Sequence, residues 1–191
     1  MRLIRIGNIC LLRIVISSTP MRPTLLLLLS LFTHLLHAQT APPPTTDQFT
    51  VTGAVRQEMA VTMADLSRFP SVNIGDVAIT NHAGEARSTL KNVKGVRLKT
   101  VLEKLAYDVP SPRQLSELYF VATAADNYKV VFSWNELFNN ALGDSVYLLT
   151  EHDGKPLPDL DDRIALLSPS DLRTGRRYVK GLKTIVVKRV E

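Results

Sequence analysis

The segment ATAADNYKVVFSWNEL, residues 122–137, carries the clearest fold signal in this chain of 191 residues. Strand-forming residues over 118–123 and 128–132 flank the turn residues ADN, and this arrangement predicts a β-hairpin. Ser133 and Glu136 then form the S-x-x-E pattern of a capping box, which predicts a short helix directly after the second strand. A strand pair that leads into a helix indicates a mixed α and β domain.

The preceding segment, GVRLKTVLEKL at 95–105, predicts a second helix. Leu98, Val101, Leu102 and Leu105 recur at the spacing of one helix face, with lysine and glutamate on the other face. A third short helix is expected at 62–69. Further strands are expected at 49–55, 77–80, 88–90, 146–150, 164–167 and 184–190, between turns rich in Gly, Pro, Asp and Asn. About seven strands and two or three short helices predict an α+β fold with a mostly antiparallel sheet or barrel-like core.

Residues 1–40 are predicted to be an export signal rather than part of the fold. Arg22 precedes the leucine-rich stretch 25–36, and Ala38 is a small residue suited to cleavage. The apolar run is short for a membrane span, so no stable span is expected after cleavage. Met21 begins this pattern cleanly and is the expected true start; a long uncleaved anchor is the alternative. Residues 41–47 then form a proline-rich linker and 48–191 the domain, in a periplasmic or secreted protein.

Removing the leader changes what the charge implies. Residues 1–38 contain four arginines and no acidic residue, so the remaining chain has 19 basic and 18 acidic side chains, a formal net charge of +1. This balance argues against general binding to nucleic acid, which needs a sustained basic surface. The only cysteine, Cys10, also lies in the leader. A cleaved product therefore has no disulfide, thiolate metal ligand or thiol nucleophile.

Several motifs in a fixed order resemble the molybdopterin-binding domain of the sulfite-oxidase-like oxidoreductases. They are, from first to last, FTVTGAV, GVRLKTVLEKL, ADNYKVVF, DGKPLP, SPSD and RRYVKG. The resemblance implies the fold of that domain and molybdopterin as a candidate cofactor. An enzyme of this kind would transfer an oxygen atom or electrons at molybdenum.

The same resemblance raises a difficulty at the metal. Family members bind molybdenum through a cysteine, and Asn81 or His82 lies near the matching position. A neutral imidazole lacks the charge and softness of a thiolate, so molybdenum in its usual form is doubtful. His82 is nevertheless the metal-ligand candidate, with a polar loop residue as the alternative interpretation. A site shared by His82 and His152 is a further hypothesis, unsupported by any tight ligand spacing.

A basic cluster near the C-terminus is the strongest candidate for anion binding. Its members are Arg173, Arg176, Arg177 and Lys180. Arginine binds phosphate through two parallel hydrogen bonds, and the intervening Thr174 and Gly175 allow close approach of backbone N–H groups. The resemblance points to Arg177 and Lys180 at the phosphate end of a pterin. The alternative is a solvated loop whose charges balance Asp171 and nearby acids.

Two functional hypotheses follow. The first is an exported domain that binds a pterin or other anionic small molecule, with uncertain enzymatic activity because the mature chain has no cysteine. The second is a non-catalytic module that binds a periplasmic protein partner on the same fold. A concave basic pocket would favour the first, whereas an exposed apolar patch or open strand edge would favour the second.

Overall fold

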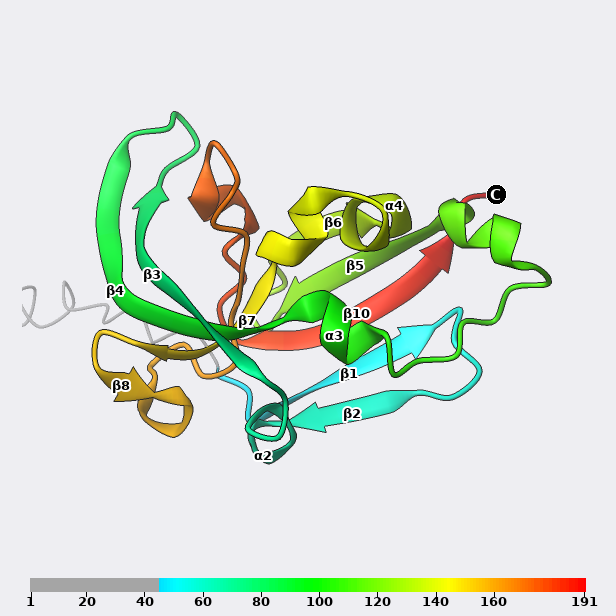
Figure 1. Cartoon of the computed structure of the whole chain (residues 1–191), viewed down its shortest axis with the longest axis horizontal. Coiled ribbons are helices and arrows are strands. Elements are labelled where there is room, and N and C mark those ends of the chain that lie inside the picture. Colours follow the sequence, from blue (N-terminus) through cyan, green and yellow to red (C-terminus); the bar gives the residue numbers. More distant parts are fainter. Residues whose placement is uncertain (1–44) are drawn as a thin grey trace, which may run out of the picture. The chain divides into compact units, whose positions relative to one another are not determined.

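The computed structural model describes residues 45–191, which form two β-sheets with short helices at their margins (Figure 1). The predicted export signal, Cys10 and most of the predicted linker lie outside the described residues. The first sheet has the strand order β2-β1-β10-β5-β6. Its strands are β1 (Gln48–Gly53), β2 (Met59–Thr62), β5 (Leu118–Ala124), β6 (Lys129–Ser133) and β10 (Leu182–Arg189).

The second sheet has the order β3-β4-β7-β8, and β9 also pairs with β7. Its strands are β3 (Ser71–Thr80), β4 (Ala86–Arg97), β7 (Tyr147–His152), β8 (Lys155–Pro156) and β9 (Leu166–Leu167). Only the β1–β10 pair is parallel among the named strand pairs of the described region. The prediction of an α+β fold with mostly antiparallel strands is therefore confirmed, although two open sheets form rather than one closed barrel.

Three short α-helices and four 3₁₀ turns complete the described region. They are α2 (Met63–Leu66), α3 (Leu98–Leu102), α4 (Trp134–Phe138), η1 (Pro112–Glu117), η2 (Ala141–Ser145), η3 (Leu157–Asp159) and η4 (Thr174–Arg177). The predicted capping box of α4 is present, because Ser133 and Glu136 exchange side-chain and backbone hydrogen bonds. The same arrangement joins Thr62 and Asp65 at the start of α2. Local hydrogen bonding thus explains two of the three helix starts.

The helix predicted to follow Gly95 begins later than expected. Gly95 lies inside β4, and α3 starts only at Leu98 and ends at Leu102. A Cβ on Gly95 would come within 2.8 Å of the Leu148 carbonyl oxygen, so this glycine permits the close contact between β4 and β7. The Gly-Val pair therefore belongs to a sheet, although the leucine spacing after it is helical.

Strand β2 was not predicted, since the sequence indicated a strand over 49–55 and then a helix over 62–69. Its four residues pair antiparallel with β1 and form one edge of the first sheet. A strand this short has too few alternating residues to be recognised by its pattern alone. It nevertheless forms one wall of a pocket described below.

The described residues contain two buried hydrophobic clusters, and the larger one joins the two sheets. The larger contains Phe49, Phe120 and Phe132 from the first sheet together with Leu148 and Leu166 from the second. The smaller lies on the second sheet and joins strand side chains such as Val77 and Ile79 to Tyr178, which follows η4. Tyr178 thereby anchors the basic loop to the second sheet.

Candidate functional site

The basic loop, residues 173–177, lies against β3 near the tip of the β3–β4 hairpin (Figure 1). Thr174 is buried and fixes this position: its hydroxyl donates to the Ala78 carbonyl at 2.7 Å and accepts from the Thr80 N–H at 3.0 Å. Gly175 permits the approach, because a Cβ there would overlap the Thr80 carbonyl oxygen. Contacts separated by more than 90 residues in sequence therefore position the arginines.

Arg177 is committed to an internal ion pair. Its Nε and Nη2 each donate to a different oxygen of Asp171 at 2.6 Å, and its Nη1 donates to Glu136 at 3.3 Å. The guanidinium also stacks 4.7 Å from the centre of the Phe132 ring, and only 19% of the side chain is exposed. The hydrogen bonds with Asp171 are the main cause that raises the pKa of Arg177. Arg177 therefore organises the loop instead of offering a free binding fork.

Glu136 connects this ion pair to the predicted helix start. Its Oε2 accepts from the Ser133 N–H at 2.7 Å, while its Oε1 accepts from Arg177. The sequence pattern identified the cap but not the second oxygen's partner, since Arg177 is 41 residues away. Ser168 is a second contributor that the pattern missed: it is fully buried and donates to Asp171 at 2.8 Å.

Arg173 and Arg176 are the exposed arginines of the loop. Neither forms an ion pair with a carboxylate of residues 45–191, although Arg176 Nη2 donates to the His82 carbonyl at 3.4 Å. With Arg177, Asp171 and Leu172 they line a pocket of about 490 Å³. Two guanidinium groups with free donors at the rim of a pocket can bind phosphate or another anion.

Lys180 is not among the residues that line this pocket. Its Nζ lies 3.1 Å from an Asp162 carboxylate oxygen and 4.9 Å from the centre of the Tyr178 ring. The Tyr178 hydroxyl donates to the same carboxylate at 2.6 Å. The structure thus groups Lys180 with Asp162 and Tyr178, apart from Arg173 and Arg176.

The metal candidate His82 lies exposed in the β3–β4 turn, and its imidazole makes no hydrogen bond within the described region. The neighbouring Asn81 closes the turn, because its side-chain oxygen accepts from the N–H groups of Ala83 at 2.9 Å and Glu85 at 3.0 Å. Within residues 45–191, no group of three or more His, Cys, Asp or Glu residues could hold a metal ion. The turn therefore offers a single imidazole and no further ligand.

His152, the last residue of β7, lies beside the middle of β4, whereas His82 lies in the turn before that strand. The adjacent Asp153 donates its N–H to the Lys91 carbonyl at 2.8 Å, and residues 86–90 of β4 separate Lys91 from Glu85 in the turn. At about 3.3 Å per strand residue, the strand segment from Glu85 to Lys91 is roughly 20 Å long, and it separates the turn that holds His82 from the position of His152. The hypothesis of a shared two-histidine site is therefore wrong for this geometry. The His152 ring instead contacts Asp153 at 2.8 Å.

Tyr178 should make the stability of the fold depend on pH. Burial, and secondly the hydrogen bond to Asp162, raise the pKa of its phenol above the ordinary value of 10.0. The unfolded chain therefore loses this proton at a lower pH than the folded chain, so the contribution to stability is complete below pH 10 and is lost as pH rises further. In urea unfolding at pH 7, the unfolding free energy of Tyr178→Phe should be about 1 kcal/mol below that of the wild type. Above pH 10, up to pH 11, it should fall less steeply with pH than that of the wild type. Equal slopes for the two proteins would contradict this.

The chain is similar to a known protein family in sequence and to a solved structure in fold. The family model described as the oxidoreductase molybdopterin binding domain matches residues 37–189. The crystal structure of the sulfane dehydrogenase SoxCD from Paracoccus pantotrophus is similar, with a TM-score of 0.54 at 18% identity. The similarity covers 75% of this chain and 39% of that chain, so the chain spans well under half of its structural neighbour. No curated protein matches the sequence.

Proposed function

Because the chain belongs to the oxidoreductase molybdopterin-binding domain family, we propose that its basic loop binds an anionic, phosphate-bearing ligand of the molybdopterin type. One observation carries this proposal: Arg173 and Arg176 are exposed, form no ion pair with a described carboxylate, and line one pocket. Arg177 supports them indirectly, since its pair with Asp171 holds the loop in shape. The ligand's phosphate would lie between the two exposed guanidinium groups.

The residues at this site fit a pterin phosphate better than they fit molybdenum. The arginines supply the donors that phosphate needs. The described residues contain no cysteine, and the nearby His82 is a single imidazole, which lacks the charge and softness of a thiolate. Molybdenum, when held by a thiolate, supplies oxygen-atom or electron transfer, and these residues offer no such ligand. We therefore propose ligand binding without assigning a redox step.

We further propose that the protein is in the periplasm or outside the cell, because residues 1–40 are predicted to be an export signal. No helix within residues 45–191 is long and apolar enough to cross a membrane. N-terminal sequencing of the protein recovered from the periplasm tests this location. A mature end near Ala38 is expected, and a retained Met1 or Met21 on membrane-bound protein would contradict it.

The double variant Arg173→Ala/Arg176→Ala tests ligand binding. After purification from cells that make and insert molybdenum cofactor, the wild-type protein should retain pterin, measured by fluorescence after extraction, and the variant should lose at least nine-tenths of it, because two charge-assisted contacts disappear. Arg113→Ala is the matched control, since Arg113 is exposed on η1 and is absent from the pocket. Equal pterin in all three proteins, or none in the wild type, would contradict the proposal.

A periplasmic protein partner is the second candidate function. Leu172 is 97% exposed at the rim of the basic pocket, and Val131 is 53% exposed on the edge strand β6. Exposed apolar side chains next to an open strand edge are typical of contact surfaces. Loss of partner capture by Leu172→Ser, in a protein that contains no pterin, would favour this second function.

A further inference from the structure

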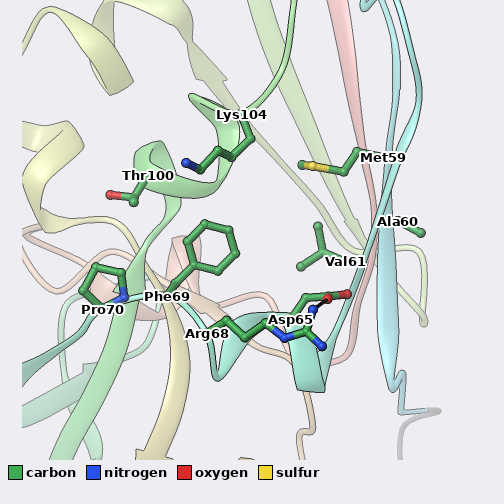
Figure 2. A pocket seen from close by; sticks show the side chains of 9 residues that line it. All are labelled: Met59, Ala60, Val61, Asp65, Arg68, Phe69, Pro70, Thr100 and Lys104. Atoms are coloured by element: carbon green, nitrogen blue, oxygen red, sulfur yellow. Dashed lines mark hydrogen bonds and ion pairs between the residues drawn. The ribbon is translucent and has the colours of Figure 1, made fainter.

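A second pocket lies between the edge strand β2 and the helices α2 and α3 (Figure 2). Its volume is about 540 Å³, within the range of small-molecule sites. It shares no lining residue with the basic pocket, so the two are separate sites. The proposal made for the basic loop therefore does not extend to it.

The interior of this pocket is apolar. Met59 and Val61 alternate on β2 and so project from the same face of the strand, and the Phe69 ring lies opposite them (Figure 2). Val61 is buried, while Met59 and Phe69 are half-buried and pack at the margin of the main core. A ligand there would cover apolar surface that is now accessible to water.

Lys104 and Thr100 supply a polar rim, four residues apart on α3 and the turn that follows it. Lys104 forms no ion pair within residues 45–191. Figure 2 shows its chain at one rim of the pocket and Arg68 at the other. An ammonium group without a counter-ion beside an apolar surface favours a ligand that carries a negative charge.

Asp65 is the one carboxylate among the lining residues, and both of its oxygens already accept hydrogen bonds. Its Oδ2 accepts from the N–H and hydroxyl of Thr62 at 3.0 and 2.7 Å, and its Oδ1 accepts from Arg68 at 3.2 Å. Arg68 therefore has a carboxylate partner, whereas Lys104 has none within residues 45–191. The positive charge available to a ligand lies on the α3 side of the pocket.

The edge of β2 argues against an added peptide strand. The Met63 N–H donates to the Asp47 carbonyl at 3.1 Å, so in this register the backbone N–H and C=O groups of Val61 and Met59 also point toward β1. The backbone groups of Ala60 and Thr62 point toward the free edge. Asp65 already accepts the Thr62 N–H. Only Ala60 within β2 then offers a free backbone pair, too few for strand addition. The shape and charge therefore suit a small molecule.

We propose that this pocket binds a small organic monocarboxylate with an aromatic or branched apolar body. The carboxylate accepts hydrogen bonds from the Lys104 ammonium and the Thr100 hydroxyl. The apolar body packs against Phe69, Met59 and Val61. This assigns the protein a second ligand, chemically distinct from a phosphate-bearing pterin.

Titration with 4-phenylbutyrate, followed by ¹H–¹⁵N NMR on the purified protein, tests the site. We expect shifts of the Ala60, Thr100 and Lys104 amides, and Lys104→Met should weaken binding about tenfold because a charge-assisted contact is lost while the alkyl chain remains. Lys188→Met is the matched control, since Lys188 is exposed on β10 and is absent from the pocket. It should bind as the wild type does.

Two ligand comparisons complete the test. The neutral 4-phenylbutyramide should bind at least tenfold more weakly than the acid, since the amide keeps the body and removes the charge. A tetrapeptide ending in phenylalanine with a free carboxylate should bind no more tightly than 4-phenylbutyrate. Shifts elsewhere, equal binding by Lys104→Met or by the amide, or clearly tighter binding by the peptide would each overturn the proposal.

Discussion

Gly175→Ala should destabilise the protein by about 3 kcal/mol, because its new Cβ would overlap the Thr80 carbonyl oxygen. The atom in the way belongs to the backbone of β3 and cannot rotate aside, so the basic loop must move away from the sheet. That movement would also break the two hydrogen bonds through which Thr174 holds the loop to Ala78 and Thr80. Thermal unfolding should show a melting temperature lower by on the order of 10 °C.

Gly154→Ala is the matched control for this prediction. Gly154 has a φ of +74°, but no heavy atom lies within 4 Å of the position a Cβ would take. Its replacement measures only the backbone cost of the left-handed conformation, about 1 kcal/mol. A loss in Gly175→Ala no greater than that in Gly154→Ala would show that the loop does not rest on β3. Pterin retention should fall in Gly175→Ala alone, since the arginines move with the loop.

Asp171→Ala should cost about 2–3 kcal/mol of unfolding free energy. The substitution leaves Arg177 with Glu136 as its remaining carboxylate partner and removes the acceptor of the buried Ser168 hydroxyl. This loss of unfolding free energy is smaller than that for breaking a fully buried ion pair, because 12% of the Asp171 side chain and 19% of the Arg177 side chain are exposed. Urea unfolding monitored by circular dichroism measures the loss.

Two further variants separate the pair's contribution from a general effect of losing an acid. Asp161→Ala should change stability by less than about 0.5 kcal/mol, because Asp161 is 92% exposed and lies 3.7 Å from Lys155. Arg177→Met combined with Asp171→Ala should be less destabilised than the sum of the single variants, since no uncompensated charge remains. Additive losses would indicate that the two side chains do not interact.

Local patterns explain how much of the fold could be predicted. The capping boxes at Thr62 and Ser133 involve partners three residues apart, so a sequence window contains both members of each interaction. The hairpin around Asp126 and Asn127 is equally local, with the Asn127 backbone in a left-handed conformation that asparagine tolerates. Strand β2 and the true start of α3 escaped prediction because neighbouring strands, not local preference, decide them.

The candidate site, too, could be predicted from the sequence only in part. Arg173, Arg176 and Arg177 were recognised together because they are close in the chain, but sequence could not show that Arg177 is committed to Asp171 and Glu136. Lys180, three residues after Arg177, pairs instead with Asp162. The pocket around Phe69 and Lys104 gave no sequence signal, because its walls come from β2, α2 and α3.

The sequence by itself determined the α+β class, the family, the helix caps and the clustering of basic residues, since each depends on residue type, order and short spacing. The tertiary structure alone decided which arginines are free, where the basic loop rests and how far His82 lies from His152. The physical reason is that ion pairing and close packing depend on distances between segments distant in the chain, such as Glu136 with Arg177 and Thr80 with Gly175. Those distances arise only when the sheets have formed.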